Sequence, residues 1–228
     1  MTRRALMVVA KKPAPGTTKT RLCPPLNGLQ AAALYEAFLL DTLALIRSAS
    51  QQIPFDPFIV FLPSDADGYF RSLAPDFGRF EQVGENLSER LNHATTHCLT
   101  ILNYDQVAIM DSDSPTLPTA SLLEAFTTLE KYDVSLGPTE DGGYYLIGLK
   151  QPAPSLFLSI TMSTPHVAQE TCEQALAAGL SLHLLPRSYD VDYIEDLRRL
   201  VNELPQLPAH IAANTRRFLS ERPDLLKG

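Results

Sequence analysis

Apolar runs and amphipathic stretches alternate along the chain. Residues 5–10 (A-L-M-V-V-A) and 106–110 (Q-V-A-I-M) are apolar runs of the kind found in central strands that are covered on both faces. Shorter apolar runs predict strands at 58–62, 80–83, 134–138 and 180–185, and one more after a glycine pair at 142–143. Apolar residues at helical spacing predict helices at 29–49, 64–73, 87–101, 119–132 and 209–219, and two more that begin near Pro165 and Asp192.

This alternation predicts an α/β fold with a mostly parallel central sheet and helices on both faces. A length of 228 residues suits one domain, 1–228. The helix at 29–49 has apolar residues on nearly all sides of its middle part, so we expect it to pack between the sheet and another layer. Asp41 lies within this apolar surface, and we expect the preceding basic loop to supply its partner.

Composition and charge narrow the possible partners. The chain is 45% hydrophobic and 20% charged, as in ordinary soluble proteins, and its net charge of −7 argues against nucleic acid or an anionic membrane as partner. Cys23, Cys98 and Cys172 are odd in number and lack C-x-x-C spacing, which indicates neither a disulfide framework nor a zinc site. No segment has the features of a signal peptide and no stretch approaches the length of a membrane span, which predicts a cytoplasmic protein.

Two carboxylates, Asp111 and Asp113, follow the buried strand at 106–110, and Pro115 prevents the strand from continuing. Open α/β sheets bind ligands at the carboxyl ends of their strands, where two carboxylates repel each other unless a cation or a proton joins them. Mg²⁺ held by one or two carboxylates and by substrate phosphates meets this need. The alternative is a strand-to-helix turn in which these side chains cap backbone N–H groups.

The segment at 11–22 (K-K-P-A-P-G-T-T-K-T-R-L) is a basic loop after the first strand. Pro15-Gly16 suits the central positions of a type II turn, which would bring Lys11 or Lys12 towards Lys19 and Arg21. Loops in this position often hold phosphates.

We therefore predict that Lys12, Lys19 and Arg21 bind nucleotide phosphates, and that Arg90, from the helix at 87–101, reaches the same crevice. The alternative is a solvated basic loop. The string G-x-x-K-T in this segment is not a Walker motif, because its Lys does not directly follow a Gly.

A glycine pair, Gly142 and Gly143, directly follows Glu140 and Asp141. Paired glycines allow a ligand to approach closely, so we predict that Gly142 and Gly143 bind substrate and that Asp141 is a catalytic base. The alternative is a glycine hairpin turn in which Asp141 is a cap.

Two further acids, Asp190 and Asp192, follow the last strand. Asp192 and Glu195 have capping-box spacing, so a helix cap explains Asp192 but not Asp190. We predict that Asp190 or Asp192 faces Asp113 across a divalent metal ion that a nucleotide helps to bind.

Several motifs in fixed order carry a resemblance that covers residues 6 to about 200. They are A-K-K-P-A-P-G-T-T-K-T-R-L, D-S-D-S-P, P-T-E-D-G-G-Y-Y-L-I-G-L, S-T-P and D-V-D-Y-I-E-D-L. Together they resemble a bacterial family of GT-A-fold proteins named as glycosyltransferase-like or nucleotide-diphospho-sugar transferase-like. The resemblance implies a GT-A fold, Asp113 as a ligand of Mg²⁺ or Mn²⁺, and Lys19 and Arg21 in the phosphate loop. The family often has Gly where Asp111 stands, so Asp113 is the ligand that the resemblance supports.

Three functions follow from these observations. The first hypothesis is a Mg²⁺-dependent glycosyltransferase that moves a sugar from a nucleotide diphosphate to an acceptor, with the metal ion and the basic loop neutralising the leaving diphosphate. The second is a nucleotidyltransferase that acts on a nucleoside triphosphate and releases pyrophosphate, since the K-x-R-L ending of the loop resembles the guanylyltransferases that act on 2-phospholactate. The third is a non-catalytic nucleotide-binding module.

Overall fold

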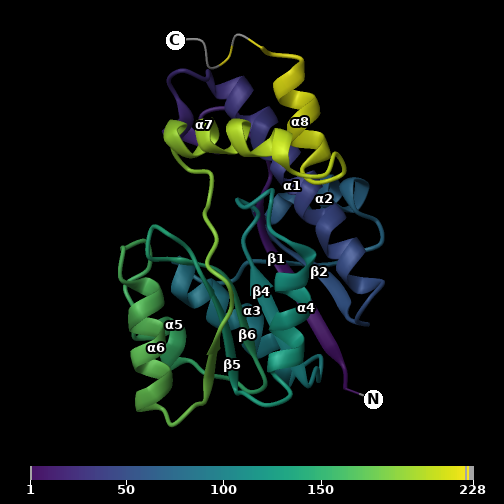
Figure 1. Ribbon diagram of the computed structural model, residues 1–228. Coiled ribbons are helices and arrows are strands. Elements are labelled where there is room, and N and C mark those ends of the chain that lie inside the picture. Colours follow the sequence, from purple (N-terminus) through teal and green to yellow (C-terminus); the bar gives the residue numbers. More distant parts are fainter. Residues whose placement is uncertain (1, 224, 226–228) are drawn as a thin grey trace.

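The computed structural model describes residues 2–223 and residue 225. Within them, seven strands form one sheet in the order β3-β2-β1-β4-β6-β5-β7 (Figure 1). The strands are β1 (Arg4–Lys11), β2 (Asp56–Leu62), β3 (Gly78–Glu81), β4 (Gln106–Met110), β5 (Val134–Pro138), β6 (Tyr144–Leu149) and β7 (Leu182–Leu184). The neighbouring strands are parallel except at β6, which runs antiparallel to both β4 and β5. The predicted mostly parallel sheet is therefore confirmed.

Helices cover both faces of the sheet, as predicted. One face packs against α1 (Gly28–Ser50), α2 (Asp67–Leu73) and α4 (Thr119–Thr128). The other packs against α3 (Leu87–Thr100), α5 (Ser155–Leu158) and α6 (Val167–Ala177). Alternate residues of β1 serve the two cores: Leu6 and Val8 face the first, and Ala5 and Met7 the second. The described residues also form three short 3₁₀ helices: η1 (Thr20–Leu22), η2 (Ser64–Ala66) and η3 (Leu204–Gln206).

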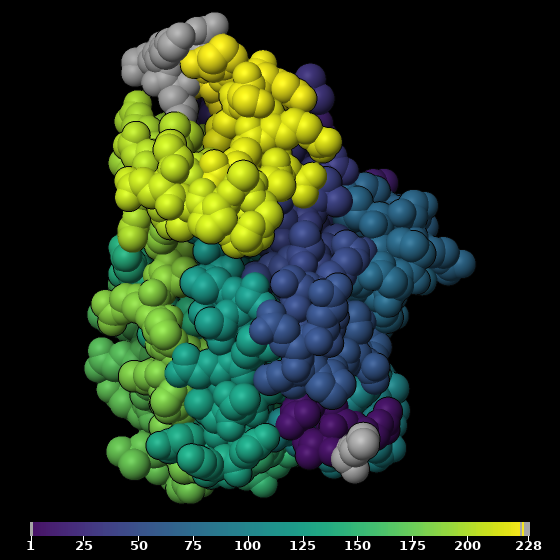
Figure 2. All heavy atoms as spheres, turned by 45° about the vertical axis from the view of Figure 1, so that its right-hand side comes forward, coloured from purple at the N-terminus to yellow at the C-terminus, as the bar shows by residue number. Residues whose placement is uncertain are grey.

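Two C-terminal helices, α7 (Ile194–Glu203) and α8 (Ala213–Ser220), form a third core with the first half of α1. Figure 2 shows the yellow C-terminal residues lying against the blue residues of α1. By length and composition alone α1 could cross a membrane, so the expectation that no stretch approaches such a length was wrong. Most of its apolar window is buried inside the protein, and α1 is accordingly a core helix.

Asp41 does not contact the basic loop, and that expectation was wrong. Its carboxylate accepts hydrogen bonds from the backbone N–H groups of Asn214 (2.8 Å) and Thr215 (2.9 Å), and from the side chains of the same two residues. Asp41 is thus a cap for the N-terminus of α8, supplied by another helix.

Two helix starts also differ from the sequence prediction. α6 begins at Val167, and Pro165 lies before it, against Gly142. The N–H of Ala168, in the first turn of α6, donates to the carbonyl of Gly142 (2.9 Å). The cap of α7 is the carboxylate of Asp196, which accepts hydrogen bonds from the N–H groups of Asp192 (3.1 Å) and Tyr193 (2.8 Å). The predicted Asp192–Glu195 capping box was therefore wrong, and the Asp192 carboxylate points elsewhere.

Candidate functional site

The candidate site is a cleft at the carboxyl ends of the parallel strands. The chain continues from β1 through β2 to β3 on one side, and β4 lies on the other side of β1. The gap between β1 and β4 is thus the topological switch point, where open α/β sheets bind ligands. The cleft there measures about 770 Å³, which is large enough for a nucleotide. Residues from the basic loop, the D-S-D turn, the glycine turn and the D-V-D segment line it together.

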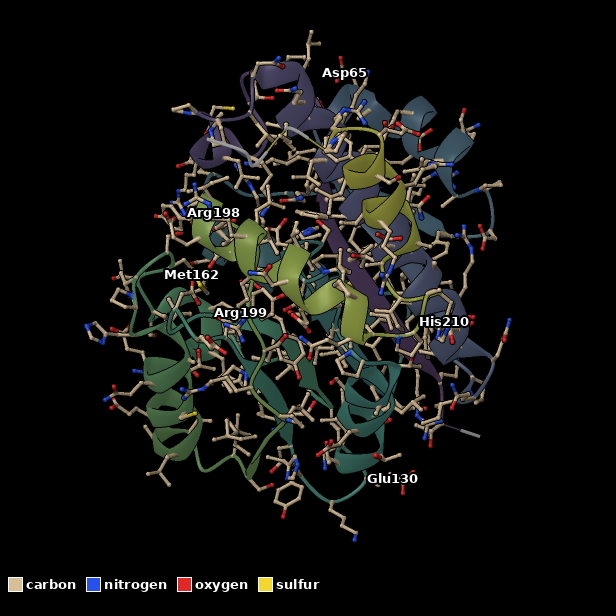
Figure 3. All side chains as sticks on the ribbon, turned by 45° about the horizontal axis from the view of Figure 1, so that its top comes forward. Asp65, Glu130, Met162, Arg198, Arg199 and His210 are labelled. Carbon is tan, nitrogen blue, oxygen red and sulfur yellow. The ribbon has the colours of Figure 1, made fainter. Side chains whose placement is uncertain are left out.

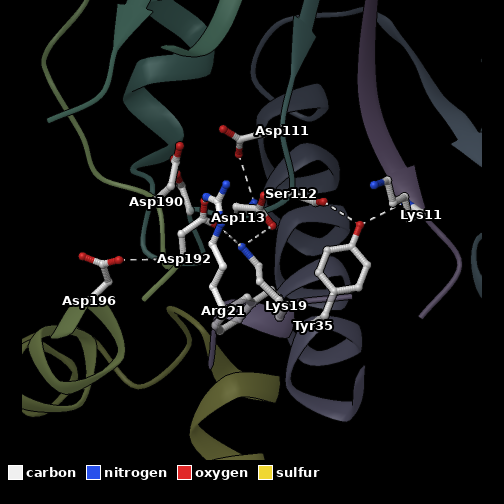
Figure 4. A network of polar contacts seen from close by, with 12 residues as sticks. Lys11, Lys19, Arg21, Tyr35, Asp111, Ser112, Asp113, Asp190, Asp192 and Asp196 are labelled. Atoms are coloured by element: carbon white, nitrogen blue, oxygen red, sulfur yellow. Dashed lines mark hydrogen bonds and ion pairs between the residues drawn. The ribbon is translucent and has the colours of Figure 1, made fainter. Parts of the chain in front are cut away.

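The basic loop folds back as predicted. The N–H of Thr17 donates to the carbonyl of Ala14 (3.2 Å), and Gly16 has a φ of 76°, as the third residue of a type II turn requires. Lys19 then has a φ of 49°, in the left-handed region that non-glycine residues seldom adopt. This conformation directs its side chain into the cleft (Figure 4).

Lys19 is the buried centre of an ion-pair network. Its ammonium lies 2.8 Å from Asp113 Oδ1 and 2.7 Å from Asp192 Oδ1, and its side chain is only 6% exposed. Arg21 lies 3.1 Å from the other oxygen of Asp192. Burial alone would lower the pKa of Lys19, but the two carboxylates outweigh it and raise this pKa above its ordinary value. Two predicted phosphate ligands and two predicted metal ligands therefore contact one another directly (Figure 4).

The backbone holds the two acidic segments together. The N–H of Val191 donates to the carbonyl of Asp113 (3.0 Å), and the hydroxyl of Ser114 donates to Asp190 (2.7 Å). Burial opposes the charged form of Asp192, but Lys19 and Arg21 outweigh this and lower its pKa. Burial, together with the charge of Asp113, raises the pKa of Asp190 to about 7.

Asp111 lies deepest in this acidic group. One of its oxygens accepts a hydrogen bond from the N–H of Asp113 (3.0 Å), as the turn-cap alternative predicted. Burial and the charges of Asp190 and Asp113 raise the pKa of Asp111 well above its ordinary range. A cation beside Asp111 and Asp190 would relieve this repulsion. Within residues 2–223 and 225, however, no three acidic, His or Cys side chains are close enough to form a metal cage by themselves. The carboxylates fit a divalent ion only if a ligand supplies further oxygens.

Tyr35 and Ser112 were not predicted as site residues. The hydroxyl of Ser112 donates to the carbonyl of Val9 (3.3 Å) and lies 3.0 Å from the hydroxyl of Tyr35, which accepts the N–H of Lys11 (3.1 Å). Tyr35 thereby links α1, the start of the basic loop and the residue between Asp111 and Asp113 (Figure 4). The sequence feature that could have identified Tyr35 is its position beside the apolar stripe of a core helix, since a buried phenol needs a hydrogen-bond partner.

The glycine turn connects β5 to β6 as a hairpin. Asp141 Oδ1 accepts the N–H of Gly143 (3.0 Å) and the hydroxyl of Thr139, which is the geometry of the turn-cap alternative. Asp141 and Gly143 also line the cleft, so the catalytic role of Asp141 stays a prediction. Gly142 has a φ of 91°, and a Cβ there would lie 1.9 Å from the carbonyl oxygen of Pro165. Gly142 is therefore required for packing, and it is not among the residues that line the cleft.

A contact from α7 fixes the same turn. Arg199 projects from α7 (Figure 3). Its guanidinium donates two hydrogen bonds to Glu140 (2.6 and 2.9 Å). Its guanidinium also lies 3.9 Å from the centre of the Tyr189 ring. Glu140 is thus engaged in an ion pair with Arg199, whereas the neighbouring Asp141 lines the cleft.

The other two predicted phosphate ligands, Arg90 and Lys12, are not part of the ion-pair network of Lys19. Arg90 lines the cleft, but its guanidinium donates to the carbonyls of Gly84 (2.9 Å) and Glu85 (3.0 Å). Lys12 is not among the residues that line the cleft, and its ammonium lies 5.9 Å from the centre of the Tyr69 ring. Lys11 lines the cleft in its place.

The chain is similar in sequence and in fold to known proteins. The 2-phospho-L-lactate guanylyltransferase of Methanothermobacter thermautotrophicus is 26% identical over 188 residues, which cover 80% of this chain and 78% of the relative. The crystal structure of a candidate nucleotide-diphospho-sugar transferase from Desulfovibrio desulfuricans G20 matches with a TM-score of 0.89 and 32% identity. This match covers 100% of the present chain and 98% of the other.

Proteins with much lower sequence identity share this fold. The 4-diphosphocytidyl-2C-methyl-D-erythritol synthase of Anaerococcus prevotii matches with a TM-score of 0.58 and 10% identity, over 90% of this chain and 99% of the other. The predicted fold type and the predicted resemblance to nucleotide-diphospho-sugar transferase-like proteins are confirmed. A family model matches residues 45–164, which is more than half of the chain. The chain belongs to the bacterial family DUF2064, which is described as an uncharacterized protein conserved in bacteria.

Proposed function

We propose that this protein is a nucleotidyltransferase that joins a nucleoside monophosphate, taken from a triphosphate, to a phosphorylated acceptor. An acceptor phosphate oxygen forms a bond to the α-phosphorus, the bond from this phosphorus to the bridging oxygen breaks, and pyrophosphate leaves. The observation that carries this proposal is the contact of Lys19 and Arg21 with Asp113 and Asp192 at the switch point.

The groups of this network match the needs of such a reaction. Lys19 and Arg21 would hold the β- and γ-phosphates with charge-assisted hydrogen bonds and so stabilise the leaving pyrophosphate. Asp113, together with Asp190 or Asp192, would hold Mg²⁺ or Mn²⁺, whose positive charge polarises the phosphate oxygens. Tyr35 would keep Ser112, and with it the two neighbouring carboxylates, in position.

Nucleotidyl transfer, the second hypothesis from the sequence, is thus preferred to sugar transfer, the first. The guanylyltransferase relative supports nucleotidyl transfer, because the aligned region covers most of both chains. Sugar transfer from a nucleotide-diphospho-sugar is the second candidate, and the similarity to the Desulfovibrio protein favours it. In that reaction the same cations would bind the leaving nucleoside diphosphate, and Asp141 would take the proton from an acceptor hydroxyl.

Product analysis distinguishes these reactions. Purified protein is incubated with Mg²⁺ and radiolabelled GTP, CTP, ATP or UTP, with 2-phospho-L-lactate as the first acceptor, and separately with nucleotide-diphospho-sugars. Pyrophosphate that appears together with a nucleotidylated acceptor, and is absent in Asp113→Asn, is the expected result. A nucleoside diphosphate released from a nucleotide sugar would identify sugar transfer instead. Nucleotide binding without either product would identify a binding module.

A further inference from the structure

Arg199, on α7, has no role in the proposed reaction, and it is not among the residues that line the cleft. Its guanidinium donates two hydrogen bonds (2.6 and 2.9 Å) to Glu140, the residue before Asp141. The same guanidinium lies 3.9 Å from the centre of the ring of Tyr189, the residue before Asp190. Asp141 and Asp190 both line the cleft, so one side chain outside it contacts the neighbour of each.

The pair of Arg199 and Glu140 has a fixed geometry but contributes little to stability. Both side chains are about half exposed (48% and 49%), and exposed ion pairs are screened by water and salt. The two hydrogen bonds nevertheless match the fork of the guanidinium to the two carboxylate oxygens, which fixes the orientation of both groups. The pair therefore determines where the glycine turn lies more than whether the protein folds.

The backbone joins the two acidic segments at Ser188. The N–H of Ser188 donates to the carbonyl of the last residue of β5 (3.0 Å), and its carbonyl accepts the N–H of Glu140 (3.0 Å). Beyond this point, no backbone hydrogen bond in the described part of the chain joins 141–143 to 189–192. The side-chain bridge through Arg199 thus begins where the backbone pairing ends.

α7 holds Arg199 in place. Leu197 and Leu200, on the same helix, are fully buried in the third core. The hydroxyl of Tyr189 donates to Glu203, which lies one turn after Arg199 on α7. The ring of Tyr189 is therefore held at its hydroxyl by one residue of α7 and contacted on its face by another, and the guanidinium is fixed with respect to both acidic segments.

A metal site depends on such control of position. Asp190 is one of the acids that the proposed reaction assigns to the divalent ion, and Asp141 stands at the same cleft on the neighbouring segment. Carboxylates bind a metal ion well only when they are held within about 0.5 Å of the productive geometry. The residues that hold them are therefore part of the site even where they do not touch the ligand.

We propose that Arg199 is a positioning residue, which holds the segments of Asp141 and Asp190 at the spacing that a divalent ion bound with a nucleotide requires. This inference rests on the proposed function in one respect, that Mg²⁺ binds in the cleft together with a nucleotide. Partners that orient metal ligands change metal affinity by about 10–100-fold, and Arg199 acts one residue further away, so we expect a loss of about tenfold.

Calorimetry with Arg199→Met tests the inference. Methionine keeps a long apolar side chain on the helix and removes every donor. The wild type is titrated with GDP, CDP, ADP and UDP to find the preferred diphosphate, whose affinity is then measured for both proteins at a series of Mg²⁺ concentrations. The Mg²⁺ concentration that gives half of the gain in affinity should rise about tenfold in Arg199→Met. Affinity without Mg²⁺ should not change, because Lys19 and Arg21 are intact.

A matched control and a second variant make the test specific. Arg198→Met removes the neighbouring arginine of α7, which is half exposed and lies 3.9 Å from Glu195, and it should behave like the wild type (Figure 3). Glu140→Ala removes the other partner of the contact and leaves α7 intact, so it should raise the Mg²⁺ requirement to the same extent. The double variant Arg199→Met with Glu140→Ala should show no larger effect than either change alone. Melting temperatures should change little, since the pair is exposed.

Three results would overturn the inference and leave the proposed function standing. The first is an unchanged Mg²⁺ requirement in Arg199→Met or in Glu140→Ala. The second is a loss of diphosphate affinity that is equal with and without Mg²⁺ and accompanies a lower melting temperature, which would make the contact only structural. The third is an additive effect in the double variant. A wild type that binds none of the four diphosphates, or binds them independently of Mg²⁺, would overturn the proposed function as well.

Discussion

Lys19 combines a rare backbone conformation with a buried charge. A left-handed conformation costs a non-glycine residue on the order of 1 kcal/mol, and the ion pairs with Asp113 and Asp192 offset that cost. Without the ammonium, these two partly buried carboxylates would face each other with only Arg21 nearby. The side chain thus supplies a positive charge at the position where the sequence predicts a metal ion.

Lys19→Ala should therefore lower thermal stability. Because Asp113 and Asp192 are each about one third exposed, we expect a destabilisation of about 1–3 kcal/mol, below the range for a fully buried pair. Melting curves of the wild type and Lys19→Ala measure this destabilisation. Arg21→Ala is the matched control, since this half-exposed partner of Asp192 should change stability little. A melting temperature of Lys19→Ala equal to that of the wild type would contradict the prediction.

Arg21 should matter for phosphate binding more than for stability. A charge-assisted hydrogen bond is worth about 1.5–3 kcal/mol, so Arg21→Ala should weaken nucleoside diphosphate binding roughly tenfold or more. Binding of the nucleoside without phosphates should not change. Calorimetry with both ligands checks this, and wild-type affinity for the diphosphate in Arg21→Ala would mean that Arg21 does not bind phosphate.

Asp141 has two possible roles that a single substitution separates. If it is a base in sugar transfer, Asp141→Asn should keep nucleotide affinity and folding while turnover falls about 10²–10⁴-fold. Release of nucleoside diphosphate from a nucleotide sugar in water is the assay. If the variant instead loses thermal stability and keeps its activity per folded molecule, the hydrogen bonds to Gly143 and Thr139 are the whole function of this carboxylate.

At the scale of elements, α8 depends on a carboxylate from α1. Asp41 is 6% exposed and accepts four hydrogen bonds at the start of α8, where backbone N–H groups lack partners within the helix. Asp41→Ala should cost about 1–3 kcal/mol of unfolding free energy, by loss of the cap and exposure of buried donors. Urea unfolding measures this cost. Asp76→Ala is the control, because its ion pair with Arg47 is at the surface. A cost as small as that of the control would show that α8 does not need Asp41.

The elements themselves were largely predictable from hydrophobic periodicity, and the direction of β6 was not. An apolar run such as 144–149 has the same pattern in a parallel and in an antiparallel strand, and the glycine pair allowed both a ligand loop and a hairpin. Helix caps were missed for a related reason. Asp41 reaches residues 173 and 174 positions away, and local spacing cannot indicate such a partner.

The site was predictable in its components but not in its contacts. Charge type and position after strand ends identified Lys19, Arg21, Asp113 and Asp192, and each of them lines the cleft. That the lysine and arginine bind Asp192 depends on the packing of segments more than 170 residues apart. Tyr35 was missed because an aromatic residue in an apolar helix is usually only part of the core.

At the scale of the whole molecule, metal and nucleotide should bind as one unit. The described residues contain no ready cage for a metal, so a divalent ion needs oxygens from the nucleotide. We predict that the affinity for nucleoside diphosphate rises with Mg²⁺ or Mn²⁺ and that this rise is lost in Asp113→Asn. Calorimetry at fixed nucleotide with varied metal is the measurement. The same affinity with and without metal would exclude this role of Asp113.

If metal and nucleotide bind here as proposed, the ion pairs of Lys19 would make binding an exchange of partners. A divalent ion that takes Asp113 or Asp192 would remove one of the two carboxylates that pair with the ammonium and so make the ammonium more available to a phosphate. A phosphate that attracts the ammonium would likewise free a carboxylate for the metal. Each ligand thus prepares the binding group of the other, and thermodynamic linkage requires that the metal raises nucleotide affinity by the same factor as the nucleotide raises metal affinity.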